Sequence, residues 1–89
     1  MTQGHRDSHH DAVGFAGLQV QELQNILAAA SEVHQEAMGI ILSAVGEDQP
    51  MESGRNALEW MAGIGDKLRE LIGICENVKA ELNRYGSGF

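Results

Sequence analysis

The residues near the N-terminus include the densest group of side chains that could bind a metal ion. His5, His9 and His10 lie close to Asp7 in the sequence. Glycines flank this stretch and it has no helical periodicity, so the sequence gives these side chains no fixed geometry. A structural metal site needs ligands held at fixed distances and angles. We therefore expect flexible, adventitious metal binding at most, and no dedicated metal site.

The central histidine and the single cysteine could in principle support nucleophilic chemistry. His34 has Glu32 and Glu36 two residues away on either side, and on a helix that spacing points side chains to different faces. Cys75 lies at a heptad core position that our register places against Ile26, about two turns from His34. An apolar environment raises the pKa of a thiol and makes it unreactive. Both residues are therefore interpreted as packing residues.

Two further chemical signatures are missing or incomplete. A di-iron site in a helical bundle uses a Glu-x-x-His pair on one helix, and this chain has none. The stretch Gly63-Ile64-Gly65-Asp66-Lys67 lacks the spacing and the Lys-Ser/Thr ending of a phosphate-binding loop. The sequence therefore predicts a non-enzymatic protein with no catalytic residues, no bound metal and no cofactor.

Composition limits the remaining functions. The chain has 89 residues, 43% of them hydrophobic, with 6 Lys and Arg against 13 Asp and Glu and a net charge of −7. This predicts one small folded domain, and the acidic balance argues against nucleic-acid binding, which requires clustered basic side chains. The sequence has no apolar stretch long enough for a membrane span, and its first residues lack the apolar core of a signal peptide.

Most of the negative charge belongs to the first half, where Arg6 is the one basic residue before position 55. This acidity is typical of a solvated face that keeps a small protein soluble. It could also form an acidic face that docks on a basic protein surface. The residues that would carry such a contact are Glu22, Glu32, Glu36, Glu47, Asp48 and Glu52.

The chain is predicted to be all-α, with a flexible N-terminal arm over 1–17 and a helical hairpin over 18–89. Apolar residues spaced by three and four predict helices over about 18–45 and 50–85. Gly46 supplies a helix stop, and Pro50 suits a first helical position. Because the connection is short, the helices must fold back antiparallel.

The apolar spacing also predicts which residues pack between the helices. In the first helix these are Leu23, Ile26, Ala30, Val33, Ala37, Ile40 and Ala44, and in the second Ala57, Met61, Ile64, Leu68, Leu71, Cys75, Val78, Leu82 and Tyr85. Pairing residues whose numbers add up to 101 places alanines of the first helix against large residues of the second. This register would also bring Glu36 near Lys67.

One flank of this predicted seam is nearly free of charge. It carries Val20, Leu27, His34, Ile41, Leu58, Gly65 and Ile72. A lone hairpin buries little surface for its size, so an exposed apolar strip on it is expected to be covered. The cover could be Val13, Phe15 and Leu18 of the arm. We favour a second hairpin, which would complete a four-helix bundle with these flank residues as the partner-binding surface.

Trp60 is a further candidate for partner binding. It lies one turn before Gly63 and Gly65, where glycines would allow another helix to approach closely. Tryptophan is enriched among the residues that dominate interface energies. It could equally cover the polar edge of its own hairpin, and the sequence favours neither role.

Residues 18–89 resemble the ESAT-6/WXG100 family of small acidic helical hairpins. Ser53, Gly54 and Ala57 match the family's turn motif, in which Glu52 replaces the tryptophan. Tyr85 matches the tyrosine of its Tyr-x-x-x-Asp/Glu tail signal, in which Phe89 replaces the acid. The resemblance implies a four-helix dimer and export by type VII secretion.

Two functions therefore remain open. The leading hypothesis is a protein–protein interaction module that dimerises or binds a partner helix, as a homo- or hetero-oligomer. The alternative is a small acidic inhibitor or adaptor, of the kind carried by phages or mobile elements. The compartment is either the cytoplasm or, under the family resemblance, the exterior reached by a non-classical route.

Overall fold

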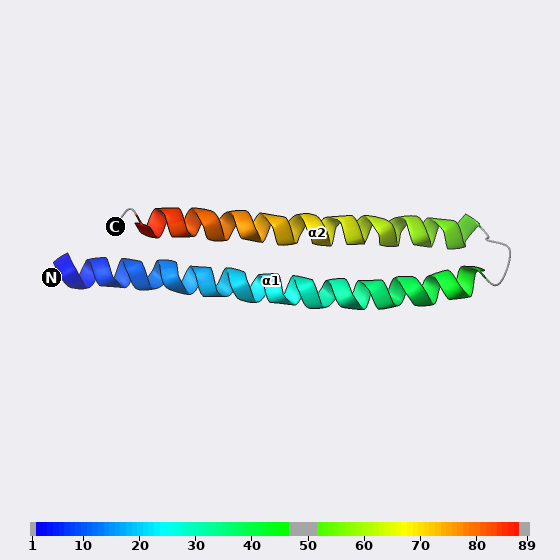
Figure 1. Ribbon diagram of the computed structural model, residues 1–89, viewed down its shortest axis with the longest axis horizontal. Coiled ribbons are helices and arrows are strands. Elements are labelled where there is room, and N and C mark those ends of the chain that lie inside the picture. The colour runs from blue at the N-terminus through cyan, green and yellow to red at the C-terminus, as the bar shows by residue number, and fades with distance from the viewer. Residues whose placement is uncertain (1, 47–51, 88–89) are drawn as a thin grey trace.

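The protein consists of two long antiparallel helices. A computed structural model describes residues 2–46 and 52–87, and the side chains of 11–46 and 52–86 within them. Helix α1 spans Thr2–Gly46 and helix α2 spans Glu52–Ser87. They lie side by side (Figure 1) and form a rod measuring 71 × 15 × 14 Å. The expected all-α hairpin is confirmed.

The N-terminal segment differs from the prediction. We expected residues 1–17 to form a flexible arm, whereas α1 already begins at Thr2. The glycines of this segment weaken a helix by about 1 kcal/mol each, but no proline interrupts the chain before Pro50. Val13 and Gly17 also continue the half-buried row of α1. The first residues of α1 extend past the end of α2 in line with the rod (Figure 1).

Apart from the start of α1, the ends of the helices lie near their predicted positions. Helix α1 ends at Gly46, as its stop signal indicates, and α2 begins at Glu52 and ends at Ser87. Pro50, which was predicted to start the second helix, lies outside the described residues. Glu52 in the first turn of α2 and Arg84 in its last turn have the signs that suit the helix dipole.

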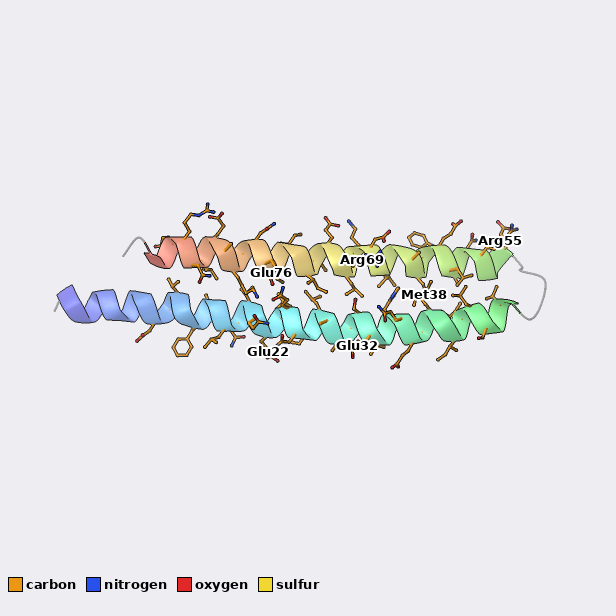
Figure 2. All side chains as sticks on the ribbon, in the orientation of Figure 1. Glu22, Glu32, Met38, Arg55, Arg69 and Glu76 are labelled. Atoms are coloured by element: carbon orange, nitrogen blue, oxygen red, sulfur yellow. The ribbon has the colours of Figure 1, made fainter. Side chains whose placement is uncertain are left out.

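The residues between the helices follow a strict heptad pattern. In α1 the less exposed positions include Val13, Gly17, Val20, Gln24, Leu27, Ser31, His34, Met38, Ile41 and Val45. In α2 they are Gly54, Leu58, Met61, Gly65, Leu68, Ile72, Cys75, Lys79, Leu82 and Gly86. We call these two rows the inter-helix seam. Met38 can be seen between the helices in Figure 2.

Three glycines fix the register of the seam. An added Cβ would meet Val45 at Gly54, His34 at Gly65 and Val13 at Gly86. In each of these pairs the two residue numbers add up to 99, whereas we predicted 101. The same register places Leu27 opposite Ile72 and Ile41 opposite Leu58. Cys75 therefore lies opposite Gln24, and its predicted pairing with Ile26 is wrong.

The predicted seam is also displaced around both helices. Met61, Leu68, Cys75 and Leu82 do lie in the seam. The large residues predicted to be buried with them are instead exposed, namely Leu23, Ile26, Val33, Ile40, Ile64, Leu71, Val78 and Tyr85. The seam instead accepts Gly, Ser, Gln, His and Lys side chains. A prediction that selects the rows with the largest apolar residues does not find those positions.

Candidate interaction surface

The predicted partner-binding flank lies inside the hairpin. Val20, Leu27, His34, Ile41, Leu58, Gly65 and Ile72 all belong to the inter-helix seam and are half-buried or buried. They were placed on a free flank because the two helices were paired through the neighbouring, more apolar rows. These seven residues hold the two helices of one chain together, and their assignment as an outward-facing surface is wrong.

Trp60 is the one predicted partner-binding residue that lies outside the seam. Its side chain is 78% exposed, the most exposed of the large hydrophobic residues in the described part of the chain. Gly63, which follows it by one turn, meets no neighbour within 4 Å of an added Cβ. Of these two glycines, only Gly65 lies close to α1, and the exposed Trp60 side chain is accessible to another molecule.

His34 occupies a notch in α2 that only a glycine can provide. An added Cβ at Gly65 would lie 2.7 Å from Cε1 of His34, which is too short for a non-bonded contact. The ring reaches the α2 backbone, where Nε2 of His34 lies 2.5 Å from the carbonyl oxygen of Met61. A carbonyl oxygen can only accept, so Nε2 carries the donated proton. His34 is therefore a satisfied packing histidine, as the sequence favoured.

A polar cluster crosses the seam nearer the C-terminal end of α2. Nε2 of Gln24 donates to Glu76 Oε1 at 2.7 Å and to the carbonyl of Ile72 at 3.3 Å. Nζ of Lys79 donates to the side-chain oxygens of Gln24 at 2.6 Å and Gln21 at 2.8 Å. A buried polar residue with satisfied hydrogen bonds can fix the register of paired helices.

The same cluster changes the acidity of one carboxyl group. Hydrogen bonds from Gln24 and Lys79, followed by the positive charge of Lys79, hold the pKa of Glu76 below its usual value of 4.5. Lys79 Nζ also lies 3.2 Å from the Glu76 carboxylate. The ionised form of Glu76 is therefore the form that the folded hairpin prefers.

Cys75 behaves as a packing residue, as predicted. It is 5% exposed and is the one hydrophobic side chain that counts as buried among the described residues. Its thiol is free. At 5% exposure, it lacks the accessible environment of a reactive cysteine.

One side of the hairpin carries an apolar surface, interrupted on α2 by Lys67 and Glu81, which we call the apolar face. Each of its members directly precedes a seam residue in the sequence, and the members from the two helices lie on the same side of the hairpin. In α1 they are Leu23, Ile26, Ala30, Val33, Ala37, Ile40 and Ala44. In α2 they are Ala57, Trp60, Ile64, Leu71, Ile74, Val78 and Tyr85. Their large side chains are between 40% exposed, at Val78, and 78% exposed, at Trp60.

The position of the polar cluster shows that the apolar-face residues of α1 and those of α2 lie on the same side of the inter-helix seam. Gln21 and Glu76 each follow a seam residue directly, and both belong to the cluster around Lys79. The side of the seam that holds the residues following it is therefore polar on both helices. In an antiparallel pair the residues preceding the seam then meet on the opposite side. Pairs such as Leu23 with Val78 lie next to each other on the apolar face, not between the helices.

The remaining surface of α2 is polar and locally paired. Lys67 pairs with Glu70, Arg69 with Asp66 and Arg84 with Glu81, each within one turn. The contact expected between Lys67 and Glu36 is replaced by the Lys67–Glu70 pair. Exposed pairs of this kind add little to stability. Because each pair joins one positive and one negative side chain, the surface charge of α2 is close to balanced.

The predicted acidic residues occupy a different part of the rod. Glu22, Glu32 and Glu36 are exposed on α1, and Figure 2 shows Glu22 and Glu32 along its outer side. Glu52 lies at the start of α2, at the other end of the hairpin from Glu22. Glu47 and Asp48 lie outside the described residues. The acidic side chains therefore do not share the apolar face.

Neither a metal site nor a membrane-spanning segment is found in the part of the chain that the structure describes. No three His, Cys, Asp or Glu side chains there are grouped for metal binding. The side chains of His5, Asp7, His9 and His10 lie outside that part. Neither described helix has a stretch apolar enough, over enough residues, to span a bilayer.

The apolar face was missed as an outer surface although most of its residues were identified as apolar positions of the two helices. The signal that would have found it is the spacing of glycines. Gly54, Gly65 and Gly86 recur at seam spacing together with Leu58, Met61 and Ile72, and a glycine allows close approach of two backbones. A seam traced through the glycines leaves the Leu23 and Ile64 rows outside.

Comparison with known proteins adds no family to this description. No family model, no curated protein and no solved structure matches the chain. Residues 52–57, which carry the resemblance to the ESAT-6/WXG100 turn motif, lie in the first turns of α2. The fold and this surface define a two-helix hairpin with one unpaired apolar face.

Proposed function

We propose that this protein is a non-enzymatic interaction module that binds a partner helix or hairpin through its apolar face, completing a four-helix bundle. The proposed contact residues are Leu23, Ile26, Val33, Ile40, Trp60, Ile64, Leu71, Ile74 and Val78. They replace the seven seam residues that the sequence suggested, whereas Trp60 is retained.

The observation that carries this proposal is the distribution of large apolar side chains. Ten large apolar side chains lie on the apolar face and remain at least 40% exposed, whereas Gly, Ser, Gln, His and Lys occupy eight of the twenty seam positions. Fully burying one large aliphatic side chain stabilises by about 1.5–3 kcal/mol. In a single chain these side chains stay largely exposed, so most of this stabilisation can be gained only when a partner covers them.

The chain's own N-terminal segment does not supply this cover. Residues 2–17 continue α1 along the rod instead of folding back over it (Figure 1). Phe15 and Leu18, which were candidates for covering an apolar strip, are themselves 66% and 67% exposed. An exposed apolar surface of this extent marks an interaction site.

Cysteine labelling inside the producing cells tests the proposal without assuming any partner. We expect Val33→Cys, on the apolar face, to react with a maleimide far more slowly than Ala28→Cys, which is exposed on the polar side. After denaturation the two should react equally. Equal reaction rates in the folded protein would contradict the proposed role of the apolar face.

The resemblance to the ESAT-6/WXG100 family suggests a more specific form of the same function. A hairpin with Ser53, Gly54 and Ala57 at turn-motif positions and Tyr85 near its end supports a protein associated with type VII secretion. If so, export in a host with that pathway should be lost on Tyr85→Ala and kept on Asn77→Ala. Export that does not depend on Tyr85 would contradict this form.

A second function is favoured by the charge of α1. Glu22, Glu32 and Glu36 are exposed on a helix that has no lysine or arginine after Arg6. This supports a small acidic inhibitor or adaptor that docks on a basic protein surface. Such binding should weaken steeply above about 0.15 M salt, where the Debye length falls below about 8 Å. Binding through the apolar face should persist.

A further inference from the structure

We infer that the occupant of the apolar face is a second copy of this chain, related by a two-fold axis parallel to the helices. In this arrangement α1 of each copy lies antiparallel on α2 of the other, so that every neighbouring pair of helices in the bundle is antiparallel. The inference rests on the proposed function and adds the identity of the partner and its geometry.

The sizes of the side chains are self-complementary about such an axis. Beside the seam, α1 presents Ala30 and Ala37 where α2 presents Leu71 and Ile64. A two-fold axis parallel to the helices places the large residues of α2 in one copy on the small residues of α1 in the other, and the symmetry repeats this contact on the second pair of helices. An axis running across the helices would instead lay large residues over large and small over small. Interdigitation of large and small residues gives native packing density.

The outer row of the apolar face agrees with the same axis. With the register of 99, Ile26 of one copy lies beside Ile74 of the second copy, and Ile40 lies beside Trp60 of the second copy. Both contacts pair large apolar side chains at matching heights along the rod. Between them, Val33 lies beside Lys67 of the second copy, whose aliphatic stem can cover it while the ammonium group stays in water. No sliding of one hairpin along the other is required to form them.

Charge repulsion also disfavours the alternative. Helix α1 carries Glu22, Glu32 and Glu36 and no lysine or arginine after Arg6, whereas the five basic residues of α2 nearly balance its six acidic residues. The proposed axis places each acidic α1 on a nearly neutral α2. An axis across the helices would bring the two acidic α1 helices together, and like charges at close range disfavour association.

The apolar face is large enough for a stable dimer. It runs roughly 40 Å along the rod, at 1.5 Å per residue, and roughly 20 Å across two packed helices. Its area is therefore on the order of 800 Å² per copy, which is what each partner contributes to a standard protein interface.

The oligomeric state of the purified full chain is the first test. Light scattering at micromolar concentration should give about twice the 9.6 kDa of one chain. A mass of one chain would overturn this inference. The labelling of Val33→Cys in cells would still decide the proposed function, because a face covered by a different protein stays protected there.

Cross-linking tests the geometry in a background that carries Cys75→Ala. When chains with Ile26→Cys and chains with Ile74→Cys are mixed, a short bismaleimide should join one of each. Either variant alone, and a mixture of Ala28→Cys with Ile74→Cys chains, should give at most a tenth of that yield. A dimer that joins Ile26→Cys chains to each other, or that shows no cross-link between the two variants, would overturn the parallel axis.

Discussion

The inter-helix seam and the apolar face run side by side along the same two helices, yet they differ in almost every physical respect. The seam contains glycines, a histidine and a hydrogen-bonded cluster around Gln24. The apolar face contains Leu, Ile, Val and Trp side chains that remain largely exposed. The seam is built for a defined register, whereas the apolar face is built for burial.

This difference separates two roles within one short hairpin. Specific polar contacts fix how helices align but add little net free energy, because each hydrogen bond replaces one with water. Apolar burial adds free energy but specifies alignment weakly. A hairpin whose seam mixes apolar residues with specific polar contacts, and whose outer face is largely apolar, gains its register from itself and can gain further stability from a partner.

The largest expected effect comes from a charge placed in the seam. Leu27→Glu puts a carboxylate opposite Ile72, in the seam between the two helices. We expect a loss of about 3 kcal/mol or more, enough to abolish most of the helical circular dichroism. Ala28→Glu, one residue later and exposed, is the matched control and should retain it. A Leu27→Glu chain that stays fully helical would contradict the observed seam.

A smaller effect is expected where the helices approach most closely. Gly65→Ala forces the His34 ring away from the Met61 carbonyl, whereas Gly63→Ala meets no neighbour within 4 Å. Alanine is favoured over glycine in a helix by about 1 kcal/mol at both sites. Thermal unfolding should therefore find Gly65→Ala less stable than Gly63→Ala by about 1–2 kcal/mol. Equal stabilities would show that His34 does not pack in the notch.

The smallest expected effect concerns the acid limb of the stability curve. Because the pKa of Glu76 is lowered in the folded chain, its ionised form contributes stability that is fully present above the unfolded value near 4.5. That contribution is lost as the pH falls through the lower folded pKa. Glu76→Gln should therefore make unfolding less dependent on pH in this window, as measured by urea titration. An unchanged pH dependence would argue against the cluster.

Two helices folding back on each other could be predicted from the sequence. The three-and-four spacing of apolar residues, the lack of proline before Pro50 and the stop at Gly46 were sufficient. The start of α1 could not be predicted in the same way, because the glycines of residues 1–17 were weighted as helix breakers. A few glycines lower helix stability without preventing a helix that continues from a stable one.

The faces of the helices could not be assigned from hydrophobicity alone. Two adjacent rows on each helix have the same spacing, and the more apolar row was taken as the seam. The pairs Leu23 with Val78 and Ala30 with Leu71 were predicted to pack between the helices, whereas these residues lie on the apolar face. The contacts of Gly54, Gly65 and Gly86 with α1, together with the hydrogen bonds of Gln24 to α2, show which row is inside.

The central claim, that the apolar face is the surface through which chains associate, is tested most directly by sedimentation equilibrium of three proteins. The wild-type chain and Ala28→Glu should both sediment at about twice 9.6 kDa, and Ile26→Glu should sediment at about 9.6 kDa. The carboxylate in Ile26→Glu would be buried beside Ile74 of the second copy, whereas that in Ala28→Glu stays in water. A mass for Ile26→Glu equal to that of the wild type would contradict the claim.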